Sequence, residues 1–348
     1  MQPDAQLIKE IKKADLRYIS DASAGFSRQK QGNDFSYLDV DGKKITTDTT
    51  LERIKNLVIP PAWTNVWICP STTGYLQATG IDDRGRKQYI YHTDWVEQTQ
   101  ENKFNSILDF AEVLPKIRNK IYIDMQEEEL EKDKIIATVI WLLEHTFIRI
   151  GNEEYAKENN SFGLTTLRNK HVKVRGKEVT FEFKGKSGIE HTVSVSHPKI
   201  AKIIKECIEL PGYEIFQYVN DDGSKHTVDS ADVNQYLKIV TGEDITAKDF
   251  RTWGATVLSA ETLHRLGPAE NATQLKKNIA TAVKKAASNL RNTTTVCRKY
   301  YIHPVIIETY QKNILIPHFE KSYANFDREK AKISRPEYAT LTLLQKYS

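Results

Sequence analysis

The chain has 348 residues, which is enough for two domains, because single hydrophobic cores stop growing at roughly 250–300 residues. Its hydrophobic content of 39%, charged content of 28% and net charge of +4 are ordinary for a soluble globular protein. The most apolar segment, residues 135–143, is much shorter than the roughly 20 residues of a membrane-spanning helix. We therefore expect a buried helix there and no contact with a membrane.

The N-terminal sequence contains no apolar stretch of the kind that directs export. Three cysteines, Cys69, Cys207 and Cys297, lie far apart in the sequence and form no CxxC pair. Both observations favour a reducing, cytoplasmic location.

The first hundred residues have the pattern of short antiparallel strands. Residues 35–46 alternate around Asp41-Gly42, which is a strong hairpin signal. Residues 65–70, 74–80 and 87–92 are further expected strands, rich in aromatic and β-branched side chains and separated by glycine turns. After about Trp95 the pattern becomes helical, so we predict a domain over residues 1–98 and a second over residues 99–348.

The second predicted domain is mainly helical. It begins with polar helices and continues with a buried segment over residues 134–150. Residues 171–195 predict three antiparallel strands with turns at 175–177 and 185–188. Helices return from His197. The predicted fold class is α+β: a small N-terminal antiparallel β-rich domain and a larger, mainly α-helical domain with a three-stranded sheet.

Charge is unevenly distributed in the C-terminal part of the chain. Residues 271–301 contain no acidic residue and several basic ones, namely Lys276, Lys277, Lys284, Lys285, Arg291, Arg298 and Lys299. Such a sided pattern favours a polyanionic partner, although a solvated basic helix has the same composition.

Metal and nucleotide motifs are absent from the sequence. There is no HExxH motif and no Cys/His cluster with zinc spacing, so no metal site is predicted. The GKSG sequence at 185–188 is not a nucleotide-binding loop, because the upstream glycine of that motif is replaced by Thr180. We expect no cofactor.

Residues 292–304, NTTTVCRKYYIHP, contain two adjacent tyrosines behind an arginine and a lysine. A phenol can attack a phosphodiester if arginines stabilise the charge on the phosphate oxygens and a lysine protonates the leaving oxygen. An ordinary phenol has a pKa near 10, and ionising it at neutral pH costs roughly 4 kcal/mol, which nearby cations reduce. Neighbouring helical residues point about 100° apart, so only one tyrosine can face the phosphate, and periodicity does not choose between them.

Several segments together resemble the type IB DNA topoisomerases, in particular their bacterial and poxvirus-like branch. They occur in the order of that family, and they are residues 25–45, 59–92, 147–172, 181–191, 248–255 and 292–304.

The resemblance implies five catalytic residues. Arg149 lies in the FIRIG sequence, Lys186 in FKGKSG and Arg251 in KDFRTWGA. The family nucleophile directly precedes Ile-His-Pro, which assigns Tyr301, and Tyr300 then occupies a position where serine is common. The poxvirus-type enzyme has a histidine nine residues before its tyrosine; here this position is Asn292, whose amide can donate a hydrogen bond but cannot transfer a proton.

The resemblance also implies residues that contact DNA. Gln88, Tyr89 and Tyr91 match a DNA-contacting stretch of the poxvirus-like enzymes, and Tyr155 matches a further such position. Alternating tyrosines lie on the same face of a strand, although a half-buried β face has the same pattern. Basic side chains beside them extend this expected surface: Arg84, Arg86 and Lys87.

The implied activity is the relaxation of positive and negative supercoils by transient single-strand cleavage and religation. The intermediate is a 3′-phosphotyrosyl bond, and neither ATP nor an obligatory metal is needed. The implied partner is double-stranded DNA, bound by a nucleoid-associated monomer. Two alternatives remain open. A tyrosine recombinase uses a similar residue set, but its His-x-x-Arg sequence has Lys248 in the histidine position here. A non-catalytic DNA-binding relative is the other.

Overall fold

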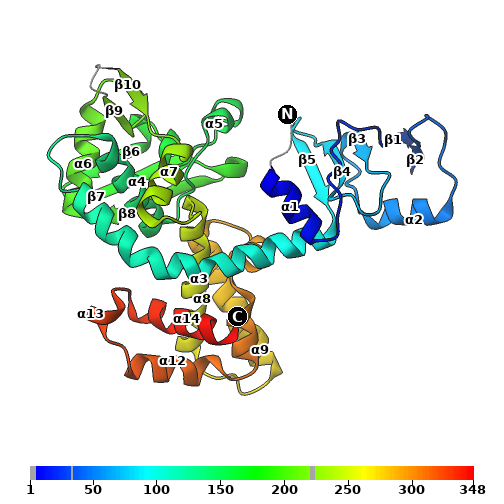
Figure 1. The fold of residues 1–348 in the computed structure, drawn as a ribbon. Coiled ribbons are helices and arrows are strands. Elements are labelled where there is room, and N and C mark those ends of the chain that lie inside the picture. Colours follow the sequence, from blue (N-terminus) through cyan, green and yellow to red (C-terminus); the bar gives the residue numbers. More distant parts are fainter. Residues whose placement is uncertain (1–4, 33, 220–223) are drawn as a thin grey trace. The chain divides into compact units, whose positions relative to one another are not determined.

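The computed structural model describes residues 5–32, 34–219 and 224–348, and its elements are labelled in Figure 1. The chain divides into two compact units, Met1–Lys103 and Phe104–Ser348. The expected domain boundary at residue 98 and this division both fall inside one helix, α3 (Thr93–Asp124). None of the helices in the described ranges is long and apolar enough to cross a membrane.

The first unit is built on a five-stranded antiparallel sheet with the strand order β2-β1-β3-β4-β5. Its elements are α1 (Ala5–Lys13), β1 (Phe26–Gln31), β2 (Asp34–Leu38), α2 (Asp48–Asn56), β3 (Thr64–Ile68), β4 (Leu76–Ile81) and β5 (Lys87–Tyr91). Ile54 of α2 and Ile68 of β3 belong to a small core that also contains Ile45, Val66 and Ala78.

The expected hairpin at Asp41-Gly42 is only partly formed. A tight turn is present, in which the Asp39 carboxylate accepts hydrogen bonds from the Asp41 and Lys43 amides at 2.9 and 2.8 Å. Beyond it, a single bridge joins Leu38 to Lys44, and no second strand follows. Strand β2 pairs with β1 along its other edge, and the chain after Lys44 enters the core at Ile45 and continues to α2.

The second unit is mainly helical and contains a three-stranded antiparallel sheet with the order β6-β7-β8. Its elements after α3 are α4 (Lys132–Thr146), α5 (Glu153–Asn159), η1 (Leu164–Thr166), η2 (Asn169–His171), β6 (Val172–Arg175), β7 (Glu178–Lys184), η3 (Lys186–Gly188), β8 (Glu190–Ser196), α6 (Pro198–Glu209), β9 (Gln217–Val219), β10 (Lys225–Thr227), α7 (Ser230–Thr241), α8 (Ala247–Leu266), α9 (Ala272–Leu290), α10 (Thr294–Tyr300), α11 (Pro304–Gln311), α12 (Leu315–Ala324), α13 (Arg328–Ala331) and α14 (Arg335–Tyr347). The α+β class and both predicted sheet regions are confirmed.

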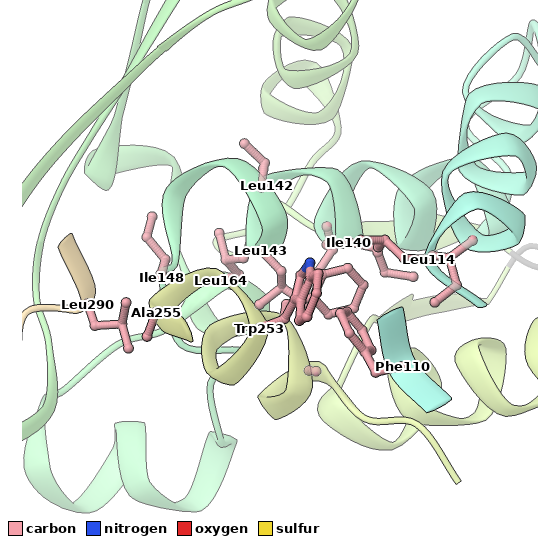
Figure 2. Close-up of a cluster of buried hydrophobic side chains, with 14 of the residues drawn as sticks. Phe110, Leu114, Ile140, Leu142, Leu143, Ile148, Leu164, Trp253, Ala255 and Leu290 are labelled. Atoms are coloured by element: carbon pink, nitrogen blue, oxygen red, sulfur yellow. The ribbon is translucent and has the colours of Figure 1, made fainter. Parts of the chain in front are cut away.

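Helix α4 is the centre of the second unit. Its side chains are buried on nearly all sides, which is typical of a helix in the middle of a core. Figure 2 shows Ile140 and Leu143 of α4 beside Phe110 of α3 and Trp253 of α8. The rings of Phe110 and Phe250 meet edge to face with centroids 4.9 Å apart. The C-terminal end of α4 and the N-terminal half of α8 therefore pack into the same hydrophobic cluster, which fixes their positions relative to each other.

Candidate active site

Arg149 lies in the loop that follows α4. The helix ends where Phe147 adopts a left-handed conformation with φ 53°. The Arg149 carbonyl accepts a hydrogen bond from the Leu164 amide at 2.9 Å, so two loop segments lie side by side. Gly163 permits this close approach, because a Cβ atom at that position would lie 2.6 Å from the Arg149 carbonyl oxygen. The FIRIG sequence is thus a helix end followed by a fixed loop.

Arg251 is 3% exposed and projects from the N-terminal part of α8. Its guanidinium donates hydrogen bonds to the carbonyl of Phe147 at the end of α4 and, at 2.9 Å, to that of Leu290 at the end of α9. Carbonyls at helix C-termini lack partners within their helix and carry partial negative charge, which suits a buried cation. Burial, and next the charge of Arg149, lower the pKa of Arg251 to about 10, so the side chain stays protonated at neutral pH.

Asn292 lies directly after α9. The chain leaves that helix through Arg291, which has φ 52°. The Asn292 Oδ1 atom accepts a hydrogen bond from Nη2 of Arg149 at 2.5 Å. Because an arginine can only donate, this contact fixes the orientation of the amide and turns its NH₂ group away from Arg149.

Two hydrogen-bond donors at this position have no partner in the described part of the chain. They are Nε of Arg251 and Nδ2 of Asn292, and both are buried. Buried donors are nearly always paired in native proteins, so such a pair calls for an explanation. Together with the two guanidinium charges, they form a site that is complementary to an anion with several acceptor oxygens, such as a phosphate.

The structure separates the two adjacent tyrosines. Tyr300 is the last residue of α10 and its side chain is 40% exposed. Tyr301 is the C-cap, with φ −131° and ψ −18°, and it is partly buried against the core. The Cζ atom of Arg251 lies 5.3 Å from the centroid of the Tyr301 ring. The charge of Arg149 also interacts with Tyr301. The tyrosine beside both arginines is therefore Tyr301.

The residues after Tyr301 hold its backbone in place. Thr256, fully buried on α8, donates from its hydroxyl to the Tyr301 carbonyl at 3.2 Å and accepts from the His303 amide at 3.1 Å. His303 caps α11 through Nδ1, which accepts from the Val305 amide at 3.3 Å, and burial lowers the pKa of His303 to about 4. The neutral histidine is thus a structural cap, followed by Pro304 at the first helical position.

Lys186 lies at the exposed tip of the β7–β8 hairpin. The tip is closed by a hydrogen bond from the Gly185 amide to the Ile189 carbonyl at 2.8 Å. The Phe162 amide donates to the Lys184 carbonyl at 2.8 Å, which ties the hairpin to the loop beside Arg149. Lys186 and Arg149 line one cavity of about 480 Å³, but Arg251, Asn292 and Tyr301 do not line it.

Tyr155 also lines this cavity. It lies in the first turn of α5, where its amide donates to the Asn152 side chain at 2.8 Å. A larger cavity of about 1190 Å³ lies elsewhere in the second unit, between α3, α4, α8 and the segment before α14, and contains none of the predicted catalytic side chains.

In the first unit, Tyr89 and Tyr91 lie on the same exposed face of β5. Their rings are stacked with centroids 6.1 Å apart, and they are 48% and 40% exposed. Lys87 lies on the same face, 5.7 Å from the Tyr89 ring, and pairs with Asp21 at 2.6 Å.

Gln88 alternates with these residues along β5 and lies on the other face of the strand. Its amide donates to the Asp82 carboxylate at 2.9 Å, and Arg86 pairs with the same carboxylate at 2.7 Å. Arg84 lies in the exposed turn between Asp82 and Arg86, and its backbone amide donates a hydrogen bond to the Asp82 carboxylate. The predicted surface thus divides into an aromatic face and a turn centred on Asp82.

Sequence reasoning missed several groups that build the site. The carbonyls of Phe147 and Leu290 hold Arg251, and Thr256 holds the backbone of Tyr301. Backbone acceptors carry no residue signature, so nothing in the sequence indicates them. Thr256 lies only a few residues after the KDFRTWGA segment, but threonine in a helix is common and gives no signal by itself.

Comparison with known proteins identifies the class first. A family model described as the catalytic core of eukaryotic DNA topoisomerase I matches residues 92–328. A second model, described as the N-terminal domain of bacterial DNA topoisomerase IB, matches residues 34–82. The fold is therefore that of a DNA topoisomerase, with the helical core and the β-rich unit each matched separately.

Similar proteins define the family more closely. DNA topoisomerase 1B of Acanthamoeba polyphaga mimivirus is 34% identical over 310 residues, covering 87% of this chain and 91% of the relative. DNA topoisomerase 1 of rabbit fibroma virus is 26% identical, covering 75% and 82%, and DNA topoisomerase 1B of vaccinia virus strain Copenhagen is 24% identical, covering 76% and 83%. The chain belongs to the type IB DNA topoisomerases, which confirms the predicted family.

Proposed function

We propose that this topoisomerase relaxes supercoiled double-stranded DNA through a transient covalent bond between Tyr301 and a 3′ phosphate. The observation that carries the proposal is the pair of buried donors without partners, Arg251 Nε and Asn292 Nδ2, beside a tyrosine. A phosphodiester placed there supplies acceptor oxygens to both donors. It also brings its phosphorus atom close to a phenol flanked by two guanidinium groups.

The reaction exchanges one phosphoester for another. The Tyr301 oxygen gives its proton to water as it attacks phosphorus, and the bond from phosphorus to the 5′ oxygen breaks. Arg149, Arg251 and Asn292 bind the non-bridging oxygens, whose negative charge grows in the transition state. Lys186 gives a proton to the leaving 5′ oxygen. Torsion in the DNA then turns the cut strand. The 5′ hydroxyl returns its proton to Lys186 as it attacks phosphorus, and the bond to the Tyr301 oxygen breaks, so that the phenolate takes a proton from water and the strand is restored.

The phosphoester formed in each step has nearly the same free energy of hydrolysis as the phosphoester that is broken, because the two are esters of a similar kind. ATP hydrolysis is therefore not needed to drive the cycle. The protein groups supply the proton transfer and the charge stabilisation, so we expect a divalent metal to be dispensable. Torsional strain of either sign relaxes by the same route, which predicts activity on positive and negative supercoils alike.

A relaxation assay in a chelator tests the proposal. Negatively and positively supercoiled plasmids are incubated with the protein in excess EDTA without ATP, and topoisomers are separated by electrophoresis. We expect both plasmids to relax in single-strand steps. A strict requirement for metal or ATP contradicts the proposal. Joint molecules formed between two duplexes indicate a recombinase, and binding without relaxation indicates a non-catalytic relative.

We propose that the hydroxyls of Tyr89 and Tyr91 contact the DNA backbone and that the charge of Lys87 strengthens this contact. Neighbouring parts of the same duplex would be bound by four further residues: Arg84, Arg86, Gln88 and Tyr155. The domains over residues 1–98 and 99–348 would then both contact the substrate. Phosphate and sugar contacts of this kind supply affinity and position without reading sequence.

Replacing both Tyr89 and Tyr91 with alanine is expected to weaken duplex binding about 30-fold, since two hydrogen bonds of roughly 1 kcal/mol each are lost. Binding is measured at fixed salt by fluorescence anisotropy of a labelled duplex. Religation within a preformed covalent complex should keep its rate. Tyr213→Ala, at another exposed tyrosine, is the matched control and should bind as wild type. If the double variant and this control bind the duplex with equal affinity, Tyr89 and Tyr91 do not contact the DNA.

We further propose a monomer in the cytoplasm, associated with the nucleoid. Three free and buried cysteines are consistent with a reducing compartment. Sedimentation of the protein alone and with a short duplex checks the monomer, and a second chain in either species contradicts it.

A further inference from the structure

His191 is a buried histidine without a role in the reaction described above. It lies on β8 opposite Phe183 of β7, and the two rings are stacked with centroids 4.9 Å apart and an interplanar angle of 13°. The side chain is 5% exposed. Neither Nδ1 nor Nε2 has a hydrogen-bond partner among the described residues.

The imidazole is neutral at physiological pH. Burial, and next the charges of Arg291, Arg149 and Arg251, lower the pKa of His191 to about 4. A neutral imidazole presents one donor and one acceptor. Leaving both unpaired in the interior costs free energy, whereas a phenylalanine would keep the stacking without this cost. Packing alone therefore does not account for a histidine at this position.

The position of the ring points to the hairpin tip. A Cβ atom added to Gly185 would lie only 2.4 Å from Nε2 of His191, so this nitrogen lies directly against the residue before Lys186. The tip itself is held by short backbone contacts, including one from the Gly188 amide to the Gly185 carbonyl at 3.0 Å. His191 thus supports the turn that carries Lys186, and the same ring lies within the electrostatic field of Arg149 and Arg251.

We propose that His191 is a positioning residue for Lys186, and that its ring nitrogens acquire hydrogen-bond partners when the hairpin tip takes its place on bound DNA. Those bonds fix the backbone from which Lys186 reaches the leaving 5′ oxygen. A neutral ring performs this task without adding a further cation beside the lysine. The inference rests on the proposed role of Lys186 as general acid.

The test uses a substrate whose leaving group needs no proton. In a duplex with sulfur in place of the bridging 5′ oxygen at the cleavage site, a thiolate leaves unprotonated, because thiols are far stronger acids than alcohols. His191→Phe keeps the ring and its stacking on Phe183 but removes both nitrogens. Single-turnover cleavage is measured for wild type, His191→Phe and Lys186→Ala on the oxygen and the sulfur substrates.

We expect His191→Phe to cleave the oxygen substrate about 10- to 100-fold more slowly than wild type, since misplacing a catalytic group by about 1 Å has effects of that size. On the sulfur substrate its rate should equal that of wild type. Its melting temperature should match or exceed that of wild type, because two unsatisfied polar atoms are removed. His191→Gln retains a hydrogen-bond donor and an acceptor, so its cleavage rate on the oxygen substrate should lie between those of His191→Phe and wild type. If the phenylalanine variant is unstable, the rates of the glutamine variant on the two substrates test the inference in its place.

Two results overturn the inference. Wild-type cleavage of the oxygen substrate by His191→Phe shows that the nitrogens have no function in cleavage. A slow rate on both substrates shows that His191 acts on the phosphate or on the fold rather than through proton transfer. The Lys186→Ala variant separates these results from a failure of the proposed function: if sulfur does not rescue it, Lys186 is not the general acid.

Discussion

Replacing Tyr301 with phenylalanine is expected to abolish covalent attachment of the protein to DNA, and replacing Tyr300 with phenylalanine is expected to leave it intact. The reason is chemical and positional. Only Tyr301 lies beside Arg251, with 5.3 Å between the ring centroid and Cζ, whereas Tyr300 is exposed at the end of α10. Removing the attacking oxygen removes the only route to the phosphotyrosine, because no substitute nucleophile occupies its place. The measurement is the yield of protein–DNA adduct after denaturation.

The Tyr300→Phe variant is the matched control for this experiment, since it removes the same atom from the adjacent residue. Both variants should bind duplex DNA with wild-type affinity. Protease digestion of the wild-type adduct, followed by sequencing of the attached peptide, should give phosphotyrosine at Tyr301 on a 3′ end. Attachment through Tyr300 would retain the enzyme class but overturn the assignment of the nucleophile.

Arg251→Lys is expected to reduce the single-turnover cleavage rate by about 10²- to 10³-fold, the usual effect of losing one preorganised donor to a developing charge. The guanidinium binds two helix-end carbonyls and still has Nε available. A lysine carries its donors on one nitrogen, so it cannot reach Phe147, Leu290 and a phosphate together. The rate is measured on a duplex with a single cleavage site.

Arg265→Lys is the control on the same helix. Arg265 is 73% exposed and pairs with Glu261 at 2.6 Å, so its replacement should change neither cleavage nor stability measurably. Arg251→Lys should also lower the melting temperature, because the carbonyls of Phe147 and Leu290 lose their partners. A cleavage rate within a few fold of wild type would show that the charge of Arg251 suffices and that its forked geometry is unimportant.

The sequence predicted much of the fold and most of the candidate site for identifiable reasons. The β6–β8 strands were recognisable because β-branched and aromatic residues alternate between two glycine-containing turns. The predicted catalytic set was proposed because arginine, lysine and tyrosine occur in family segments in the correct order. Its placement around Tyr301 stays a prediction that the adduct experiment tests.

Other features depend on contacts between distant residues and were beyond sequence reasoning. Helical periodicity treated Tyr300 and Tyr301 as equivalent, because it does not show that α10 ends between them. The Asp41-Gly42 signal was correct for a turn but gave no information on the strand that follows. The division of the β5 surface arises from the Asp82 carboxylate, which accepts from Gln88 and Arg86.

The two carbonyl contacts of Arg251 have a consequence for local opening of the protein. One side chain joins the C-terminal ends of α4 and α9 to α8, so neither of these two ends can fray without breaking its hydrogen bond to the buried Arg251. Regions linked in this way open cooperatively, and their amide hydrogens exchange with solvent only when the whole unit opens. The groups proposed to bind the phosphate would therefore share the stability of the core, and we expect them to stay assembled while a cut strand turns.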